Sequence, residues 1–285
     1  MWSNFIIISF LCAANAIYTG EVLTEDGVGL VGKPQPIEKY PYHVTIEELP
    51  YFCAGSIIST NYVITSASCV TDAIYYNLTV RTGSNVWNEG GVVHKIQKVM
   101  AHEKHKLSAF GTPENDIALV RVTPPFKFDK TVQPIEMFKS TEKVKHGEMA
   151  NVTGMGETEM SPSSELLVVD LPIVAEDICD FSYVTMGGIA SDQICAGFIG
   201  EGGNGKSPCY SDGGAPLAVS GRLAGVLSWQ KECGEPYKPA VFSEIAYHRS
   251  WIDHHISNID SKYYYYKNHE HDHADNNEPL SVSLL

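Results

Sequence analysis

The chain has 285 residues, of which 44% are hydrophobic and 19% are charged, so it can bury a sizeable core in one large domain or two small ones. The formal net charge of -14 at pH 7 argues against nucleic acid or an acidic membrane as a partner, because both would be repelled over most of the surface. This charge leaves proteins, peptides and cations as partners.

Residues 1–16 indicate a secretory signal peptide, with an apolar run from Phe5 to Leu11 and then the small residues Ala14 and Ala16 around a cleavage point. The competing interpretation is a membrane anchor, but the run is well short of the roughly 20 residues that span a bilayer. No later segment is long and apolar enough to do so. We therefore expect a secreted, extracellular protein that starts with a short segment, 17–29.

The cysteine count fits an oxidising compartment. Removing Cys12 with the signal peptide leaves an even number of cysteines, which predicts disulfides but not their pairing. Zinc binding is the competing interpretation, although the chain has no C-x2-C pair. Two sequons, at Asn77 and Asn151, predict N-glycans on a secreted chain. The remaining cysteines are Cys53, Cys69, Cys179, Cys195, Cys209 and Cys233.

Short β-rich runs separated by Gly, Pro, Asn and Ser predict an all-β sandwich or barrel. These runs cover residues 43–47, 55–58, 62–65, 117–122, 167–169 and 224–228. One helix is predicted near the end of the chain, over residues 246–257, where Trp251, Ile252 and Ile256 recur near helical spacing.

Residues 259–285 have a different composition, with four consecutive tyrosines and a His/Asp/Glu cluster, and are predicted to form a flexible tail. His269, His271 and His273 are ligand types suited to zinc, copper or nickel. A polar, solvated chain end is the favoured interpretation, because nothing preorganises a metal site there. We expect no metal site and no cofactor.

Three ordered segments carry the chemistry: YFCAGSIISTNYVITSASCV at residues 51–70, ENDIALVRV at 114–122 and SPCYSDGGAPLAV at 207–219. Together they resemble the trypsin-like serine proteases, whose segments read C-G-G-S-[IL]-I, [IL]-T-A-A-H-C, N-D-I-A-L-[IL] and C-x-G-D-S-G-G-P-L. The resemblance covers nearly all of the mature chain and implies a protease domain over residues 30–258. It implies two packed six-stranded antiparallel β-barrels with a C-terminal helix, and the pairs Cys53–Cys69, Cys179–Cys195 and Cys209–Cys233.

The resemblance also locates the catalytic positions. A serine-protease triad needs a hydroxyl to attack, an imidazole to take its proton and a carboxylate to hold the imidazole. Asp116 is implied at the carboxylate position, Ser68 at the imidazole position and Gly213 at the nucleophile position. A serine hydroxyl is far too weak a base to replace an imidazole. Ser211 stands where the family has a glycine whose N–H, with that of residue 213, forms the oxyanion hole.

A substitute base is not expected from the sequence, because no other histidine matches a family position that faces the nucleophile. The candidates weighed for this role are His43, His94, His102 and His105.

The substrate pocket differs from that of trypsin. Ser207 stands where trypsin carries the aspartate that pairs with Lys or Arg, so the pocket floor is uncharged. Ala240 and Gln230 replace glycines and are expected to narrow the cleft. Ser228 and Trp229 are retained, so an extended peptide could still add along that edge.

The activation apparatus is also altered. Family zymogens are cut after Lys or Arg to free an ammonium group that pairs with the aspartate before the nucleophile. Leu30-Val31-Gly32 lies near the expected start, but the first basic residue of the chain is Lys33. We therefore expect a single uncut chain in which Asp212 lacks its ammonium partner.

These features predict a secreted, monomeric protease homologue of arthropod type that is not an enzyme. The resemblance implies a cofactor, decoy or regulator of an extracellular protease cascade in immunity, melanisation or clotting, or a venom component. Its partners would be extracellular proteases, zymogens or inhibitors. Two alternatives remain: an active serine endopeptidase with a relocated nucleophile, and a metal-binding or structural protein that acts through its tail.

Overall fold

The computed structural model describes residues 32–48, 51–71, 78–155, 157–158, 161–162, 165–200, 206–209 and 212–269. For residues 48, 157–158, 161–162 and 259–269 it describes the backbone alone. The predictions made for the signal peptide, the segment 17–29, Leu30, Val31, Asn77, Ser211 and the chain beyond His269 fall outside these residues.

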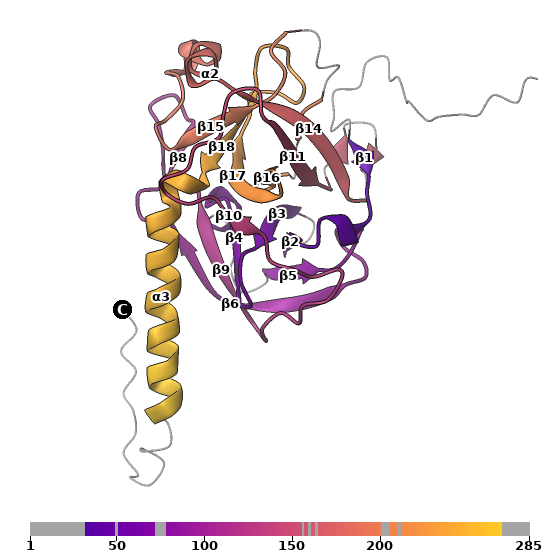
Figure 1. Cartoon of the computed structure of the whole chain (residues 1–285), viewed down its shortest axis with the longest axis vertical. Helices are drawn as coiled ribbons and strands as arrows, with labels where there is room; N and C mark the ends of the chain where they lie inside the picture. The colour runs from indigo at the N-terminus through magenta and orange to yellow at the C-terminus, as the bar shows by residue number, and fades with distance from the viewer. Residues whose placement is uncertain are drawn as a thin grey trace, which may run out of the picture.

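The first half of the chain forms a closed antiparallel barrel in the strand order β2-β3-β4-β9-β6-β5 (Figure 1). Val63 and Val120 are fully buried inside it, as expected for β-branched side chains, which pack well on a pleated surface. The strands are β2 (His43–Glu48), β3 (Tyr51–Ile57), β4 (Tyr62–Thr65), β5 (Thr79–Thr82), β6 (Val92–Ala101) and β9 (Ala118–Thr123).

The second half forms another barrel, in the order β14-β11-β16-β17-β18-β15, which closes because β15 pairs again with β14. Leu171 and Phe242 are fully buried within it. The predicted fold, two six-stranded antiparallel barrels, is confirmed. The strands are β11 (Met149–Gly154), β14 (Leu167–Val174), β15 (Gln193–Ala196), β16 (Pro216–Val219), β17 (Arg222–Trp229) and β18 (Ala240–Glu244).

Short strands complete the sheets. β1 (Lys33–Pro34) pairs with β14, and β10 (Glu136–Met137) pairs in parallel with β17. Two small hairpins join β7 (Lys106–Leu107) to β8 (Pro113–Glu114) and β12 (Glu157–Thr158) to β13 (Ser161–Pro162). The first of these hairpins leads directly into Asp116.

The barrels share one continuous core, which fixes their relative position. Ile64 and Leu119 from the first barrel belong to the same buried cluster as Leu217 and Leu227 from the second. The three predicted disulfides are all present, joining Cys53 to Cys69, Cys179 to Cys195 and Cys209 to Cys233. In the chain-entropy view, closing loops of this size stabilises the fold by about 3 kcal/mol per bridge.

The helices lie at the edges of the barrels: η1 (Ile37–Lys39), α1 (Ser68–Thr71), α2 (Glu176–Ser182), η2 (Val184–Met186) and α3 (Ile245–His269). The predicted start of α3 is correct to one residue, but the predicted flexible tail from residue 259 is wrong as far as His269. Residues 258–269 contain no glycine or proline to end a helix.

α3 begins on the second barrel and runs alongside the first (Figure 1). Its Trp251 indole N–H donates to Glu103 Oε2 at 2.8 Å, and His255 Nε2 lies 2.8 Å from Glu103 Oε1. Within the described part of the chain, no helix is both long and apolar enough to span a membrane.

Candidate active site

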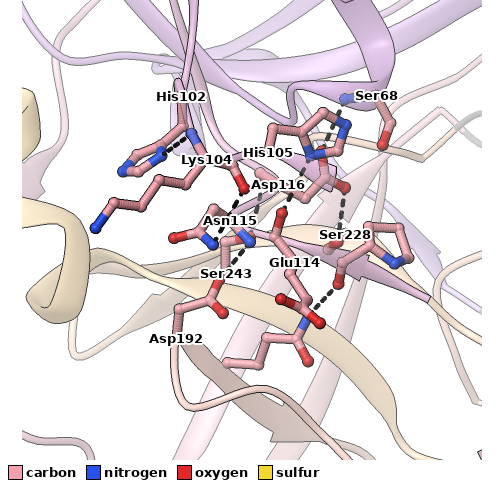
Figure 2. A network of polar contacts seen from close by, with 12 residues as sticks. Ser68, His102, Lys104, His105, Glu114, Asn115, Asp116, Asp192, Ser228 and Ser243 are labelled. Atoms are coloured by element: carbon pink, nitrogen blue, oxygen red, sulfur yellow. Dashed lines mark hydrogen bonds and ion pairs between the residues drawn. The ribbon is translucent and has the colours of Figure 1, made fainter. Parts of the chain in front are cut away.

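Asp116 is fully buried at the junction of the two barrels, between β8 and β9. Its Oδ1 accepts a hydrogen bond of 2.7 Å from the Ser68 backbone N–H, and its Oδ2 accepts one of 2.6 Å from the Ser228 hydroxyl (Figure 2). Hydrogen bonds to a charged acceptor are roughly twice as strong as neutral ones, which offsets the cost of burying the carboxylate. The carboxylate is therefore fixed by one group from each barrel.

The turn before Asp116 explains how the carboxylate is aimed. Asn115 has a φ of 49°, a left-handed conformation that asparagine tolerates better than most residues. Its backbone N–H donates to Asp192 Oδ2 at 3.0 Å, and the Ser243 hydroxyl donates to the Asp116 carbonyl at 2.7 Å. These two hydrogen bonds fix the backbone of Asn115 and Asp116 where the two barrels meet.

Ser68 and Gly213 lie beside the same disulfide. Ser68 is an exposed residue at the start of α1, directly before Cys69. A Cβ atom at Gly213 would lie 3.1 Å from Cys69 Sγ and 3.6 Å from Cys53 Sγ, and the Gly213 carbonyl accepts a hydrogen bond of 2.8 Å from Ala54. The fold thus brings the three positions that the motifs identify, 68, 116 and 213, to one region between the barrels.

His105, which the sequence led us to reject as a substitute base, lies beside Asp116. Its Nδ1 lies 3.9 Å from Asp116 Oδ1 and 3.2 Å from the Glu114 carbonyl oxygen, and the side chain is 17% exposed. His105 matches no family position that faces the nucleophile, but its imidazole lies near Asp116. The signal was the hairpin of β7 and β8, which pairs Lys106 with Glu114 and so brings the preceding residue next to Asp116.

The other histidines weighed as bases lie elsewhere. His43 is buried, with Nδ1 2.9 Å from Thr153 Oγ1, and burial lowers its pKa to about 3. His94 contacts Thr82, and burial lowers its pKa from the ordinary value. His102 packs with Trp251 at a ring separation of 4.9 Å, and burial followed by the nearby His248 lowers its pKa.

The residues expected to line the specificity pocket are uncharged, and two of them, Ser207 and Gln230, contact each other. The Ser207 hydroxyl is buried and lies 3.1 Å from Gln230 Oε1, while Gln230 Nε2 lies 3.4 Å from Cys233 Sγ. Ala240 is buried, and half-buried Trp229 packs edge-on against Tyr183 with ring centres 4.6 Å apart. The Gln230 side chain therefore contacts Ser207, the residue expected at the pocket floor, and the narrowing of the cleft stays a prediction.

The segment before Gly214 retains tight backbone geometry. Gly214 has a φ of 80°, and a Cβ there would lie 2.2 Å from the Ala54 carbonyl oxygen, so only glycine fits. Asp212 is buried, and its Oδ2 accepts a hydrogen bond of 2.8 Å from Cys209 N–H. The chain start that would supply an ammonium group to Asp212 lies outside the described residues.

Asn151, the sequon residue within the described part of the chain, lies on β11 between β14 and β16. Its side-chain amide donates to Asp170 Oδ1 on the neighbouring strand. Glycosylation there would have to displace this hydrogen bond, and it stays a prediction.

The paired barrels and the serine-bound aspartate between them define the class of chymotrypsin-fold serine proteases. The comparison with known families agrees, since residues 30–252 match the family described as Trypsin. The chain belongs to the trypsin family.

Several arthropod proteins are similar over most of the chain. A trypsin from Phaedon cochleariae is 29% identical over 244 residues, covering 84% of this chain and 92% of the relative. Hypodermin-A from Hypoderma lineatum is 32% identical, and the match covers 90% of this chain and 99% of the relative. Trypsin zeta from Drosophila melanogaster is 32% identical, and the match covers 89% of this chain and 98% of the relative.

These relatives contradict the prediction that the chain is not an enzyme. Proteins named trypsin align with it almost end to end, and their names suggest serine protease activity. The prediction relied on the residue types at positions 68 and 213, and it rejected His105 because that residue matches no family position that faces the nucleophile; His105 Nδ1 lies 3.9 Å from Asp116 Oδ1. These two residues do restrict the chemistry, because the imidazole must come from a position other than 68 and the reacting hydroxyl from a position other than 213.

Proposed function

We propose that the chain is a secreted serine endopeptidase of the trypsin family that uses a nucleophile other than residue 213. The observation that carries this proposal is the buried Asp116 carboxylate, held at 2.7 and 2.6 Å by Ser68 and Ser228 with an imidazole 3.9 Å away. A carboxylate, an imidazole and hydroxyl groups in one region between the barrels are components that acyl transfer from a peptide requires. The trypsin names of the relatives support the same reaction class.

The substrate class follows from the pocket. An extended peptide adding along the end of β17 would contact Ser228 and half-buried Trp229. Ser207 offers a neutral hydroxyl at the pocket floor, and Gln230 reduces the space above it. We therefore expect a preference for small, neutral side chains before the cleaved bond, and not for Lys or Arg.

Secretion is part of the proposal. The three disulfides support folding in an oxidising compartment, where they persist. Extracellular proteins, including proteases, zymogens and inhibitors of a cascade, would then be its substrates and partners. In this setting the protein would act as a monomer and carry N-glycans at Asn77 and Asn151.

A fluorophosphonate probe tests the proposal, because it labels only activated serines. The full secreted chain is incubated with the probe and with a panel of peptides that differ in the residue before the cleaved bond, alongside active trypsin and heat-denatured chain. Labelling of the native chain alone, with turnover of peptides bearing neutral residues, is the expected result. Absence of both, under conditions that label trypsin, would overturn the proposal and mean that the residues at 68 and 213 have abolished the chemistry.

A further inference from the structure

We propose that Asp192 and His248 are positioning residues for the site. The Asp192 carboxylate holds the backbone turn that aims Asp116, and His248 on α3 holds the Asp192 carboxylate. This assignment rests on the proposed function, because it takes Asp116 as the carboxylate of the reaction. Asp192 lies directly before β15 and His248 near the start of α3, 56 residues apart, and the fold brings them together beside Asn115.

The Asp192 carboxylate is buried and has two partners. Its Oδ2 accepts a hydrogen bond of 3.0 Å from the Asn115 backbone N–H (Figure 2). The same oxygen lies 3.3 Å from Nε2 of His248. Asp192 is 3% exposed and His248 is 1% exposed. Because a buried carboxylate is costly unless it is paired and hydrogen-bonded, both contacts are needed to keep Asp192 in this place.

The residue after Asp192 holds the same strand. Gln193 is buried, and its side-chain Nε2 donates to the Pro113 carbonyl at 2.8 Å. Pro113 lies on β8, which leads directly to Asn115. Two consecutive residues of the second barrel, Asp192 and Gln193, therefore fix the chain at positions 113 and 115, immediately before the site carboxylate.

The turn at Asn115 needs such a contact. Its φ of 49° is a left-handed conformation, which persists in a residue other than glycine only when the surrounding contacts hold it. Without the bond to Asp192 the turn can relax, and Asp116 moves with it. The carboxylate would then shift from Ser68 and Ser228, which donate to it at 2.7 and 2.6 Å.

Helix α3 also contacts the chain on the other side of Asp116. The ring of His248 lies 5.1 Å from the ring of His102, centre to centre. The His102 backbone N–H in turn donates to the Ile117 carbonyl at 3.0 Å. His248 therefore contacts one residue bonded to position 115 and another bonded to position 117, so the place of the helix is coupled to the place of Asp116.

Hydrogen exchange of the Asn115 backbone amide, measured by NMR in the full secreted chain, reports the proposed contact and needs no activity. The native chain is compared with Asp192→Asn, which keeps an oxygen acceptor, and with the double variant Asp192→Leu, His248→Phe. Replacing both members of a buried pair by apolar groups commonly leaves a protein stable. Arg249→Gln is the control, because it removes a contact between α3 and the Phe138 carbonyl but leaves Asp192 in place.

We expect the Asn115 amide to exchange at least about tenfold faster in the double variant, as for the loss of a hydrogen bond to a charged acceptor. Asp192→Asn and Arg249→Gln should exchange close to the native rate. Fluorophosphonate labelling and kcat for peptides with neutral residues should fall about tenfold to a hundredfold in the double variant, since displacing a reacting group by roughly 1 Å costs that much. KM should change little, and Asp192→Asn should restore most of the rate.

Each variant is checked by its unfolding temperature, and Asp192→Ala takes the place of the double variant if that protein does not fold. Unchanged exchange at Asn115 in the folded variant overturns the assignment, whatever the activity. Faster exchange with unchanged labelling and kcat also overturns it, because the pair would then support the turn without positioning Asp116. An effect on KM alone would place the action of the pair in the pocket and count against the assignment.

The two proposals can fail separately. A native chain that shows neither labelling nor turnover overturns the endopeptidase function, while the exchange of the Asn115 amide still decides whether Asp192 and His248 hold the turn. A native chain that is labelled, with exchange and rates that the double variant leaves unchanged, keeps the endopeptidase function and loses the assignment.

Discussion

His43 should make the fold sensitive to acid. It lies on β2, is 1% exposed and bonds through Nδ1 to Thr153 on β11, so it links the two barrels. Burial lowers its pKa from 6.5 to about 3. Because the folded pKa is below the unfolded one, the unfolded chain takes up the proton first, and the stability present above pH 6.5 is lost as the pH falls toward 3. At pH 4 the loss is about 3 kcal/mol, at 1.36 kcal/mol per pH unit.

The measurement compares the free energy of unfolding of the native chain and His43→Gln in urea, at pH 7 and pH 4, by tryptophan fluorescence. Glutamine is neutral at both pH values and can still bond to Thr153. Acidic residues titrate in both proteins, so their effect cancels in the difference. The native chain should lose about 3 kcal/mol more than His43→Gln, while exposed His254→Gln should follow the native chain. An equal loss in the native chain and His43→Gln would refute burial of a neutral His43.

Three further predictions concern the core and the cleft. Leu171→Ala should lower the free energy of unfolding, measured in urea, by about 2–5 kcal/mol, because Leu171 is fully buried. Exposed Met149→Ala should change it by less than about 0.5 kcal/mol. Similar losses in the two variants would refute the assigned core. Gln230→Gly should lower KM for peptides with neutral residues before the cleaved bond by about tenfold, or about 1.4 kcal/mol, and an unchanged KM would mean that Gln230 does not narrow the pocket. The double variant Ser68→His, Gly213→Ser should be labelled by fluorophosphonate at position 213. The Cβ of the new serine would lie 3.1 Å from Cys69 Sγ, so only a small shift of the neighbouring sulfur is needed to accommodate it. A folded but unlabelled double variant would contradict this prediction.

The β-rich runs could be predicted from the sequence because their signals are local, and the run over residues 62–65 corresponds to β4 as the structure has it. The two-barrel arrangement and the cysteine pairs, which are those that form, were implied by the resemblance to the trypsin-like proteases. Strand β6 (Val92–Ala101) was missed because polar side chains such as Lys95, Gln97 and Lys98 interrupt its apolar pattern. It is a strand because β5 and β9 pair with it on both sides, which is a tertiary effect.

The candidate site was only partly predictable for a related reason. Asp116, Ser68 and Gly213 are each marked by a motif, so their approximate positions follow from the family pattern. His105 belongs to no motif, and its distance from Asp116 depends on how the hairpin of β7 and β8 folds back. A sequence shows which positions have lost the expected residue types, but not which side chain enters the vacated space.

The hydrogen bonds of Asp116 decide which variants can test catalysis. Ser68 in the first barrel and Ser228 in the second both donate to the Asp116 carboxylate, whereas Ser243 in the second barrel donates to the Asp116 backbone carbonyl. Removing the carboxylate would weaken the contact between the two barrels. A loss of activity in Asp116→Ala could then result from this structural change or from the missing catalytic carboxylate. Ser68 uses its backbone N–H for this contact, and His105 approaches at 3.9 Å, beyond hydrogen-bond distance. Side-chain changes at 68 and 105 thus leave the contact between the two barrels intact, so these two positions, and not Asp116, can separate chemistry from folding.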